Sequence, residues 1–519
     1  MTTSPGIRLP VSETTVLIAG GGPAGLAAAA ELTHHGIECL VVEPRAEVSH
    51  DRPRAKTTNV RTMEHFRRWG LAREIRAAAP VPHGWSDRVV FCDSLDGTEI
   101  TSFPGAFALS SSPAPTHAES ALAIPQPVVE EVLRRHLARR APAAAEWGSR
   151  VTAVAEEADR VLVTVEDGSG AARQVAARYL LGCDGPGSLV RKEIGARFVG
   201  HSDPRPNFNV VFSAPDLDPE LPPAVQYWVV GGPHPGLIGR LDLRGTWWAI
   251  FPGTGQEFGE AHSAELIGGL VGHTVEHTVL ASDPWQARML VADRFQTDRV
   301  FLVGESAHLN PPWGGHGFNT SVGDAVNIGW KIAAVVQGWG KPALPASYEA
   351  ERRPVVQQTI DAAESNLGAG IGDLARDAEQ IQLRKRAEFH SLGLVLGYHY
   401  GGSPIVTGGS VQRPTDLDRY VPSADAGRRL PHAWLENGAS LYDSLGRELT
   451  LLGRFAADRA TVETARRTAA SLGIPLTIVE APASYPWRDR HFLVRPDQHI
   501  AWSGTGLTPE IIATAVGAG

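Results

Sequence analysis

The chain has 519 residues, too many for one hydrophobic core, and this length predicts roughly two to four domains. Its 43% hydrophobic and 20% charged residues are typical of an ordinary soluble globular protein. The 48 basic and 57 acidic residues leave a net charge of −9, which excludes the electrostatic signature of a protein that binds nucleic acid or an anionic membrane surface.

Cysteine usage and hydropathy indicate the compartment. Cys39, Cys92 and Cys183 are widely spaced and match neither a metal cluster nor a disulfide framework. Two of them lie in apolar runs, so we expect buried thiols in a reducing compartment. The first ten residues lack a signal-peptide pattern, and no apolar run is long enough to cross a bilayer. We therefore expect a cytoplasmic enzyme with no metal site.

After a short tail, residues 14–43 predict a strand, a glycine turn, a helix and a second strand. The turn has the spacing G-x-G-x-x-G, formed by Gly20, Gly22 and Gly25. One glycine permits the tight turn, one lets the backbone approach a pyrophosphate, and one allows close helix–strand packing. Glu43 ends the second strand, where a carboxylate can bind a ribose hydroxyl. We interpret the unit as a dinucleotide site; the alternative is a glycine-rich turn without a ligand.

Two polar segments follow this unit. A basic turn at 51–56 leads into a helix through residues 61–66; the turn either is a solvated charged segment or supplies one arginine that reaches back to the pyrophosphate. Later, Pro127 is placed to start a helix, whose apolar residues recur at helical spacing: Val128, Val132, Leu133 and Leu137. Gln126 would sit just before this helix, as a satisfied structural amide or as a ligand contact.

The middle of the chain predicts strands. An alternating pattern over 150–165 and a Gly-Ser-Gly turn predict a hairpin or meander, and a buried strand ends at Asp184. Between 200 and 290 we expect a mostly antiparallel sheet in a separate lobe, from short runs at 209–213, 226–230, 237–243 and 246–252. The aromatic residues of this lobe form either its core or a ligand cage.

The last third returns to helices and then to a small α/β unit. A buried strand over 300–305 ends in Glu305 and is followed by a glycine-rich loop, after which we expect a helix from Ser321 onward. Residues 345–400 look helical, and 401–435 look like a linker. The final segment alternates strands and helices, at 449–453, 461–471, 475–479, 491–495 and 508–516.

Three separated segments carry a resemblance to a known family: the glycine turn, Cys183-Asp184-Gly185, and Gly304-Glu305-Ser306-Ala307-His308. Over residues 14–360 the chain resembles the single-component FAD-dependent aromatic hydroxylases, the class of para-hydroxybenzoate hydroxylase and phenol hydroxylase. It is most similar to the chlorophenol and polyketide-tailoring hydroxylases. The run Leu493-Val494-Arg495-Pro496-Asp497-Gln498 resembles the thioredoxin-like extension of the larger members.

The resemblance implies an α/β fold in which a Rossmann-type FAD-binding domain is combined with a β-sheet substrate lobe and a C-terminal thioredoxin-like domain. The FAD-binding domain would comprise residues 1–75, 121–199 and 296–400, the last part with a helical segment. The substrate lobe would comprise 76–120 and the sheet of 200–295. Residues 401–519 would form a linker and the thioredoxin-like domain.

The resemblance also implies roles for single residues. Gly20, Gly22 and Gly25, with Pro23 and Ala24 beside them, would hold the FAD pyrophosphate, and Glu43 would bind the adenosine ribose. The remaining cofactor contacts would be Arg54 (phosphate and ribityl region), Gln126 (ribityl chain), Asp184 (FAD and NAD(P)H), Glu305 (ribitol hydroxyls), and Pro311, Pro312, Gly317, Phe318 and Asn319 (isoalloxazine).

The chain departs from the family pattern at one position. The family usually has Asp where this chain has Glu305, which keeps the acceptor charge but extends it by one methylene group. The C-terminal extension has no cysteine and therefore cannot perform dithiol chemistry. We expect it to be structural or dimerising, which leaves a homodimer as one arrangement.

The implied reaction uses NAD(P)H and O₂ to hydroxylate a phenolic substrate through a flavin hydroperoxide, in natural-product tailoring or phenol metabolism. A base that activates the phenol is expected. The candidate catalytic residues are Pro312, His316 and Tyr227, with His234 a further candidate by location only. Alternative functions are Baeyer–Villiger oxygenation, epoxidation, and non-catalytic FAD binding. Neither the choice between NADPH and NADH nor the substrate follows from the sequence.

Overall fold

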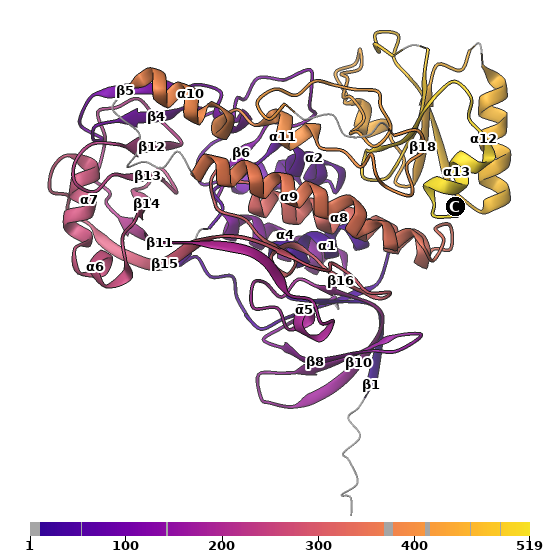
Figure 1. The fold of residues 1–519 in the computed structure, drawn as a ribbon, viewed down its shortest axis with the longest axis horizontal. Helices are drawn as coiled ribbons and strands as arrows, with labels where there is room; N and C mark the ends of the chain where they lie inside the picture. Colours follow the sequence, from indigo (N-terminus) through magenta and orange to yellow (C-terminus); the bar gives the residue numbers. More distant parts are fainter. Residues whose placement is uncertain are drawn as a thin grey trace, which may run out of the picture.

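The computed structural model describes residues 11–52, 54–141, 144–367, 377–409, 416–456, 458–487 and 489–518. Most of the predicted N-terminal tail lies outside the described residues, and residues 11–13 already belong to the first strand. Figure 1 shows a central region crossed by two long helices, α8 and α9, with a sheet-rich lobe on its left and a C-terminal unit on its right. The mixed α/β fold confirms the predicted fold class.

A mixed sheet forms the base of the central region. Its strand order is β7-β2-β1-β10-β9-β8, and β16 also pairs with β10. These strands are β1 (Val11–Ala19), β2 (Cys39–Glu43), β7 (Ala145–Trp147), β8 (Arg150–Glu156), β9 (Val161–Glu166), β10 (Ala172–Gly182) and β16 (Val300–Leu302). Because β1 runs parallel to β2 and β10, and β10 parallel to β16, the carboxyl ends of these four strands share one edge. In open α/β sheets, ligands bind at this edge.

The helices of this region are α1 (Pro23–His34), α2 (Val60–Arg68), α3 (Ala72–Ala78), α4 (Gln126–Arg140), α5 (Leu189–Glu193), α8 (Gly317–Val336) and α9 (Ser347–Leu367). Helix α1 packs against both α4 and α8. Its buried residues 24–32 include an alanine run, and these small side chains let the neighbouring helices and the sheet approach it from several sides. Short elements complete the region: β3 (Thr57–Thr58), β6 (Leu122–Ala123), η2 (Gly304–Ser306) and η3 (Leu344–Ala346).

The lobe contains a second sheet with the order β17-β15-β11-β14-β13-β12-β4-β5. Its strands are β4 (Val89–Cys92), β5 (Glu99–Phe103), β11 (Phe198–Ser213), β12 (Gln226–Val229), β13 (Gly236–Arg240), β14 (Thr246–Pro252), β15 (Thr278–Ala292) and β17 (His308–Leu309). Its pairs are antiparallel except β12 with β4. The mostly antiparallel sheet was predicted. Strand β11, however, begins at Phe198 rather than at residue 209. The prediction missed the first half of this strand because its residues are largely exposed and show no apolar alternation.

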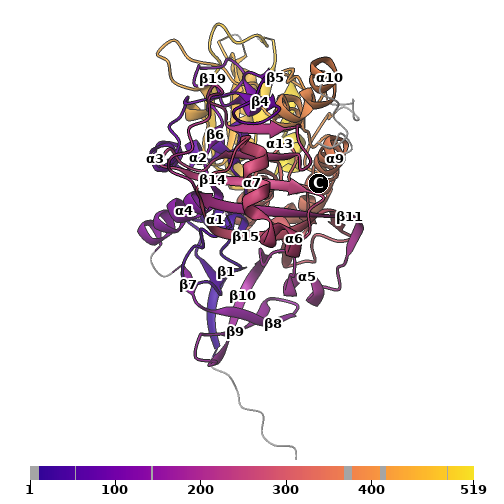
Figure 2. The same ribbon diagram turned by 90° about the vertical axis from the view of Figure 1, so that its left-hand side faces the viewer.

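The two faces of this sheet have different cores. Helices α6 (Gln256–Ala261) and α7 (Ser263–Val271) belong to the outer side, and Figure 2 shows α7 in front of the sheet. The buried cluster on this side includes Tyr227 and Trp247 with residues of α7. The cluster on the opposite, inner face includes Trp228 and Trp248, together with residues of α10 (Ala378–Phe389). Neighbouring tryptophans therefore face opposite sides, as the strand period requires.

The C-terminal unit contains a sheet with the order β19-β18-β20-β21. Its elements are β18 (Leu449–Gly453), α12 (Arg459–Leu472), β19 (Leu476–Glu480), β20 (His491–Val494), β21 (Ile500–Gly504) and α13 (Pro509–Ala515). Strand β18 is parallel to β19 and antiparallel to β20, an arrangement that agrees with a thioredoxin-like core. The unit joins the central region through α11 (Leu392–Gly397) and a segment that includes η5 (Leu441–Ser444).

Two further local predictions were wrong. Helix α8 begins at Gly317 rather than Ser321, because Gly314 and Gly315, both with positive φ, complete the turn before it. Gln126 is the first residue of α4 rather than the residue before it. The remaining short helix of the lobe, η1 (Ala106–Ala108), follows Gly105.

Candidate active site

The three motif glycines have different surroundings at the end of β1. Gly20 has a φ of +101°, and a Cβ there would overlap the Cys183 carbonyl. A Cβ on Gly25 would overlap the Gly20 carbonyl, so this glycine is required for close packing of helix and strand. A Cβ on Gly22 would meet only the Arg45 guanidinium, at 3.8 Å. Gly22 therefore borders free space at the N-terminus of α1, where a pyrophosphate fits.

Glu43 lies beside this turn, at the end of β2. Its carboxylate accepts hydrogen bonds from the Gly21 N–H (2.6 Å) and from the Arg45 N–H and Nε (3.0 and 2.6 Å). The carboxylate is almost fully buried and is held in one orientation by these donors. A carboxylate has about four acceptor positions, so Glu43 can still accept a hydroxyl hydrogen bond from a ribose.

Asp184 follows β10 on the same edge, and its bonds organise the next turn. One carboxylate oxygen accepts from the Ser188 hydroxyl at 2.5 Å, and the other accepts from the Val190 N–H at 3.0 Å. These contacts fix the start of α5. The segment before Asp184 also supports the glycine turn, because the Cys183 N–H donates to the Ala19 carbonyl at 2.8 Å.

Glu305 lies in η2, after β16 ends at Leu302, so the strand predicted over 300–305 is shorter than expected. Glu305 differs from the other acids of this edge. Its side chain is exposed and forms no hydrogen bond or ion pair with the described residues. The backbone around it is rigid, since the neighbouring Ser306 is buried and its hydroxyl donates to the Val303 carbonyl at 2.8 Å. An unpaired carboxylate on a rigid turn is a suitable acceptor for ligand hydroxyls.

Asp324 holds the Glu305 turn in place and is fully buried in α8. Its carboxylate accepts from His308 Nε2 (2.8 Å), Arg352 Nε (2.7 Å) and the Gly304 N–H (3.3 Å). Burial raises the pKa of Asp324, but the Arg352 and His308 interactions outweigh it and leave the pKa below its usual value. The sequence did not single out Asp324 as a site residue; its only signal was an acid inside a helix of mostly apolar and small residues.

The loop at 311–319 is fastened to the segment that contains Thr57. Asn319 donates from Nδ2 to the carbonyls of Thr57 (3.2 Å) and Gly315 (2.8 Å), and its Oδ1 accepts from the Asn59 N–H (2.9 Å). Pro311 and Phe318 are buried, whereas Pro312 is exposed and its carbonyl closes a turn with the Gly315 N–H. The N–H groups at the start of α8 therefore lie beside a fixed backbone turn that can face a ligand.

Arg54 and Gln126 flank the same region. Arg54 is exposed, has a positive φ of 46°, and its guanidinium forms no hydrogen bond or ion pair with the described residues. Such a φ is uncommon outside glycine and is often found at functional sites. Gln126 is partly buried and donates from Nε2 to Glu130 at 2.8 Å. Glu130 also lies 3.4 Å from Arg45, which the sequence did not single out.

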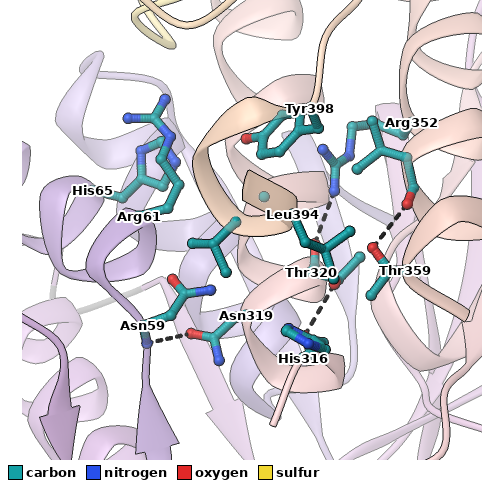
Figure 3. A pocket seen from close by; sticks show the side chains of 13 residues that line it. Asn59, Arg61, His65, His316, Asn319, Thr320, Arg352, Thr359, Leu394 and Tyr398 are labelled. Atoms are coloured by element: carbon teal, nitrogen blue, oxygen red, sulfur yellow. Dashed lines mark hydrogen bonds between the residues drawn. The ribbon is translucent and has the colours of Figure 1, made fainter. Parts of the chain in front are cut away.

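A polar cavity of about 420 Å³, including its open mouth, lies between α2, α8, α9 and α11. Figure 3 shows Asn59, Arg61 and His65 on one side and His316, Thr320 and Arg352 on the other. His316 is buried, and its Nε2 has no hydrogen-bond partner among the described residues. Burial lowers the pKa of His316 to about 4, so its imidazole is neutral near pH 7.

A second cavity, which we call the lobe cavity, has about 400 Å³ of space, again with its opening. It lies between the β3–β6 pair and the inner face of the lobe sheet. Its lining includes Lys56, Ile124, Gln226, Leu241 and Trp248. The sequence did not single out Lys56 or Trp248 for this position, because the cavity forms only when segments more than 190 positions apart meet.

The other candidate catalytic residues lie outside both cavities. Tyr227 is buried on the outer face of the lobe sheet, where its hydroxyl donates to the Pro222 carbonyl at 3.0 Å. Burial raises the pKa of Tyr227 to about 12. His234 lies in a loop with its ring 5.7 Å from that of Phe258. His308 is bound to Asp324 and, at 2.7 Å, to Asn310. The structure therefore does not bring Tyr227 or His234 to the carboxyl edge.

The glycine turn, the buried carboxylate of Glu43 and the unpaired carboxylate of Glu305 fit a dinucleotide cofactor bound at the carboxyl edge. Comparison with known proteins identifies this cofactor as FAD. Residues 13–363 match the FAD binding domain family, and residues 423–517 match the aromatic-ring hydroxylase C-terminal family. The protein is thus a flavoprotein monooxygenase with FAD as its cofactor, and it belongs to the FAD-dependent aromatic-ring hydroxylases.

Curated relatives support this assignment over nearly the whole chain. The 2,4-dichlorophenol 6-monooxygenase of Delftia acidovorans is 30% identical, with 95% of each chain covered. Aklavinone 12-hydroxylase DnrF of Streptomyces peucetius is 32% identical, with 82% of this chain and 87% of the relative covered. Phenol 2-monooxygenase of a Pseudomonas strain is 27% identical, with 96% and 91% covered.

Solved structures are similar as well. The rebeccamycin biosynthetic enzyme RebC with reduced flavin has a TM-score of 0.87 and 32% identity, covering 98% of this chain and 100% of that one. Aklavinone-11 hydroxylase in complex with FAD and aklavinone has a TM-score of 0.85 and 26% identity, with 97% and 99% covered. No helix in the described part of the chain is both long and apolar enough to span a membrane.

Proposed function

We propose that this protein uses NAD(P)H and O₂ to hydroxylate a phenolic aromatic substrate. The observation that carries the proposal is the shared carboxyl edge of β1, β2, β10 and β16, with the lobe cavity on the other side of the Thr57 segment. NAD(P)H supplies two electrons; one oxygen atom enters the ring and the other leaves as water. FAD supplies the reductive activation of O₂ that the side chains of a protein cannot provide.

The chain's own residues bind and orient the cofactor. Gly20, Gly22 and Gly25 would leave room for the pyrophosphate, and Glu43 would accept a hydrogen bond from the adenosine ribose. Asp184, Gln126 and Arg54 would bind the middle part of the cofactor, and Glu305 would accept the ribitol hydroxyls. The flavin ring would be held by the loop and helix start that include Pro311, Pro312, Gly317, Phe318 and Asn319, where backbone N–H groups can stabilise negative charge.

The second requirement is a chamber for the aromatic substrate, and we assign this role to the lobe cavity. Ile124, Leu241 and Trp248 line it, and Trp228 and other aromatic residues pack behind it on the inner face of the lobe sheet. Exclusion of water favours transfer of oxygen to the ring over its release as hydrogen peroxide. Of the candidate catalytic residues, His316 lines the other cavity, between α2, α8, α9 and α11, and Pro312 lies in the loop before α8. A neutral His316 can accept a proton, whereas Tyr227 lies across the sheet.

The test is substrate-stimulated oxidation of NADPH and NADH by the FAD-loaded protein. Phenol, 2,4-dichlorophenol and a polycyclic phenol such as aklavinone would be compared, with hydrogen peroxide release measured in parallel. We expect at least one phenol to accelerate NAD(P)H oxidation and to gain one oxygen atom on the ring by mass spectrometry. Fragmentation showing a ring-inserted ester, or FAD binding without any stimulation, would contradict the proposal.

Glu305 provides a sharper test of the cofactor site. Glu305→Ala should weaken FAD binding about tenfold, because one charge-assisted hydrogen bond contributes about 1.5–3 kcal/mol. Glu305→Asp should retain most of the affinity, and Glu436→Ala, which removes an exposed acid of the C-terminal unit, should retain all of it. The measurement is the FAD dissociation constant from quenching of flavin fluorescence. Equal affinities for Glu305→Ala and the wild type would remove Glu305 from the site.

A further inference from the structure

Two basic residues, Lys56 and Arg240, are among the lining residues of the lobe cavity, and Lys56 lies beside an aromatic ring. The Lys56 ammonium lies 4.3 Å above the ring of Trp248 and donates to the Arg54 carbonyl at 3.1 Å. An ammonium group has three N–H donors, so two remain for a ligand. Among the described residues, no carboxylate lies within ion-pair distance of Lys56, and no acidic residue lines the cavity.

The guanidinium of Arg240, the other basic residue of the lining, already contacts groups of the protein. Arg240 borders the cavity from β13, but its guanidinium lies 4.1 Å from the ring of Trp247, on the outer face of the sheet. There it donates to the Leu217 carbonyl at 3.4 Å and lies 3.6 Å from the Asp218 carboxylate. Lys56 is therefore the cation that faces the lobe cavity without a counter-charge.

Backbone hydrogen bonds hold Lys56 between the lobe cavity and the loop at 311–319, which we call the cofactor loop. Its carbonyl accepts from the Ile124 N–H at 2.9 Å, within the β3–β6 pair. The next residue, Thr57, binds Asn319 of the cofactor loop. A ligand that contacts the Lys56 ammonium would thus lie one residue from the backbone that supports this loop.

We propose that Lys56 selects aromatic substrates that bear an anionic oxygen, a carboxylate or a phenolate, and that its ammonium binds this oxygen beside Trp248. The inference deepens the proposed function and rests on it. A cation in an apolar cavity gains most from a ligand that neutralises it, since a charge-assisted hydrogen bond is roughly twice as strong as a neutral one. The aromatic body of such a ligand would pack against Ile124, Leu241 and Trp248.

The protonation state agrees with this role. Burial lowers the pKa of Lys56 to about 8, so the amine is mostly protonated at pH 7. An anionic ligand would favour the protonated form further.

The experiment measures dissociation constants for matched ligand pairs on the FAD-loaded protein at pH 7. The carboxylate pair is 3-hydroxy-2-naphthoate and 3-hydroxy-2-naphthamide. The phenolate pair is pentafluorophenol, which is ionised at this pH, and its methyl ether. Binding is followed by perturbation of the visible flavin spectrum, without NAD(P)H. The variants are Lys56→Met, Lys56→Arg and, as a matched control, Lys192→Met, which changes an exposed lysine on α5.

We expect the wild type and Lys192→Met to bind at least one anion about tenfold more tightly than its neutral partner. Lys56→Met should lose this preference while binding the neutral partner within about twofold of the wild type, and Lys56→Arg should keep part of it. The pair that shows the preference identifies the anionic group. A wild type without any preference, a preference that survives in Lys56→Met, or failure of all four ligands to bind would overturn the inference.

The outcomes also separate this inference from the proposed function. If phenols stimulate NAD(P)H oxidation but the charge preference is absent, the role of Lys56 is wrong and the hydroxylase function stands. If no phenol stimulates NAD(P)H oxidation, the proposed function fails, whatever Lys56 binds.

Discussion

At the scale of single residues, glycines of one motif perform different tasks. Gly25 is required by packing, since a Cβ there would overlap the Gly20 carbonyl. Gly22 has a φ of −74°, which any residue can adopt, and its missing side chain faces open space. The motif glycines therefore divide into those that the fold requires, Gly20 and Gly25, and one that it does not require, Gly22.

Two alanine substitutions can distinguish the role of Gly22 from that of Gly25. Gly22→Ala should leave the melting temperature of the FAD-free protein within about 2 °C of the wild type but weaken FAD binding at least tenfold, because its methyl group occupies the pyrophosphate space. Gly25→Ala should lower the melting temperature of the FAD-free protein as well, because backbone atoms must move. Calorimetry of the FAD-free protein and fluorescence titration with FAD provide the two measurements. Equal destabilisation by both substitutions would contradict this division.

At the scale of elements, the start of α8 joins three other segments through Asp324. His308 comes from β17 in the lobe sheet, Arg352 comes from α9, and Gly304 belongs to the turn that presents Glu305. The Asp324 carboxylate thus connects the turn at 304–306, the lobe sheet and helix α9. The position of Glu305 depends on these interactions rather than on β16 alone.

Asp324→Asn tests this connection. The amide keeps the volume but removes the charge, which leaves the Arg352 guanidinium buried without its counter-charge, and we expect a loss of about 3–5 kcal/mol in unfolding free energy. The matched control is Asp361→Asn, an exposed α9 residue paired with Gln357, with an expected change within about 0.5 kcal/mol. Urea unfolding monitored by circular dichroism measures both. Similar unfolding midpoints for the two variants would rule out the connecting role.

At the scale of the whole molecule, a buried charged cluster joins the C-terminal unit to the central helices. Glu351 of α9 accepts from Lys331 Nζ (2.7 Å) and from both terminal nitrogens of Arg495 (2.6 and 2.8 Å). Arg495 also binds Asp497, and Trp330 of α8 donates to the same aspartate at 3.2 Å. Apolar packing surrounds this cluster, since Trp330 and Trp339 share a core with residues of β18 and α13.

The cluster predicts an acid-sensitive contact. Burial raises the pKa of Glu351, but the charges of Arg495 and Lys331 outweigh it and lower the pKa to about 2. A carboxylate whose pKa is lower in the folded state stabilises the fold above its unfolded pKa, and this contribution is lost as the pH falls toward 2. We therefore expect the urea midpoint to fall between about pH 5 and pH 2.

Glu351→Gln should lower the midpoint at pH 7 and flatten this pH dependence, because the titrating group is gone. The control is Glu364→Gln, which changes a surface carboxylate of α9 paired with His201. It should retain the wild-type pH profile. A Glu351→Gln profile as steep as that of the wild type would assign the acid sensitivity to other carboxylates.

The sequence by itself determined the local units of this protein, because their causes are local. Four features follow from spacing and periodicity within short windows: the glycine turn after β1, the acids at or shortly after the ends of β2, β10 and β16, the antiparallel lobe, and the C-terminal α/β alternation. Most of the helix and strand locations therefore agree with the prediction. The prediction was wrong at the start of α8 and in the first half of β11, because polar and glycine residues interrupt the apolar periodicity there.

Only the tertiary structure decided which side chains meet. Tyr227 and Trp228 are neighbours in the sequence, but the pleat of β12 directs one to the outer core and the other toward the inner face. Lys56 and Trp248 are 192 positions apart, yet they are in contact and both line the lobe cavity. Asp324 gains its partners from segments on either side of it in the chain. Such contacts depend on strand order, register and packing between distant segments, which no local pattern in the chain encodes.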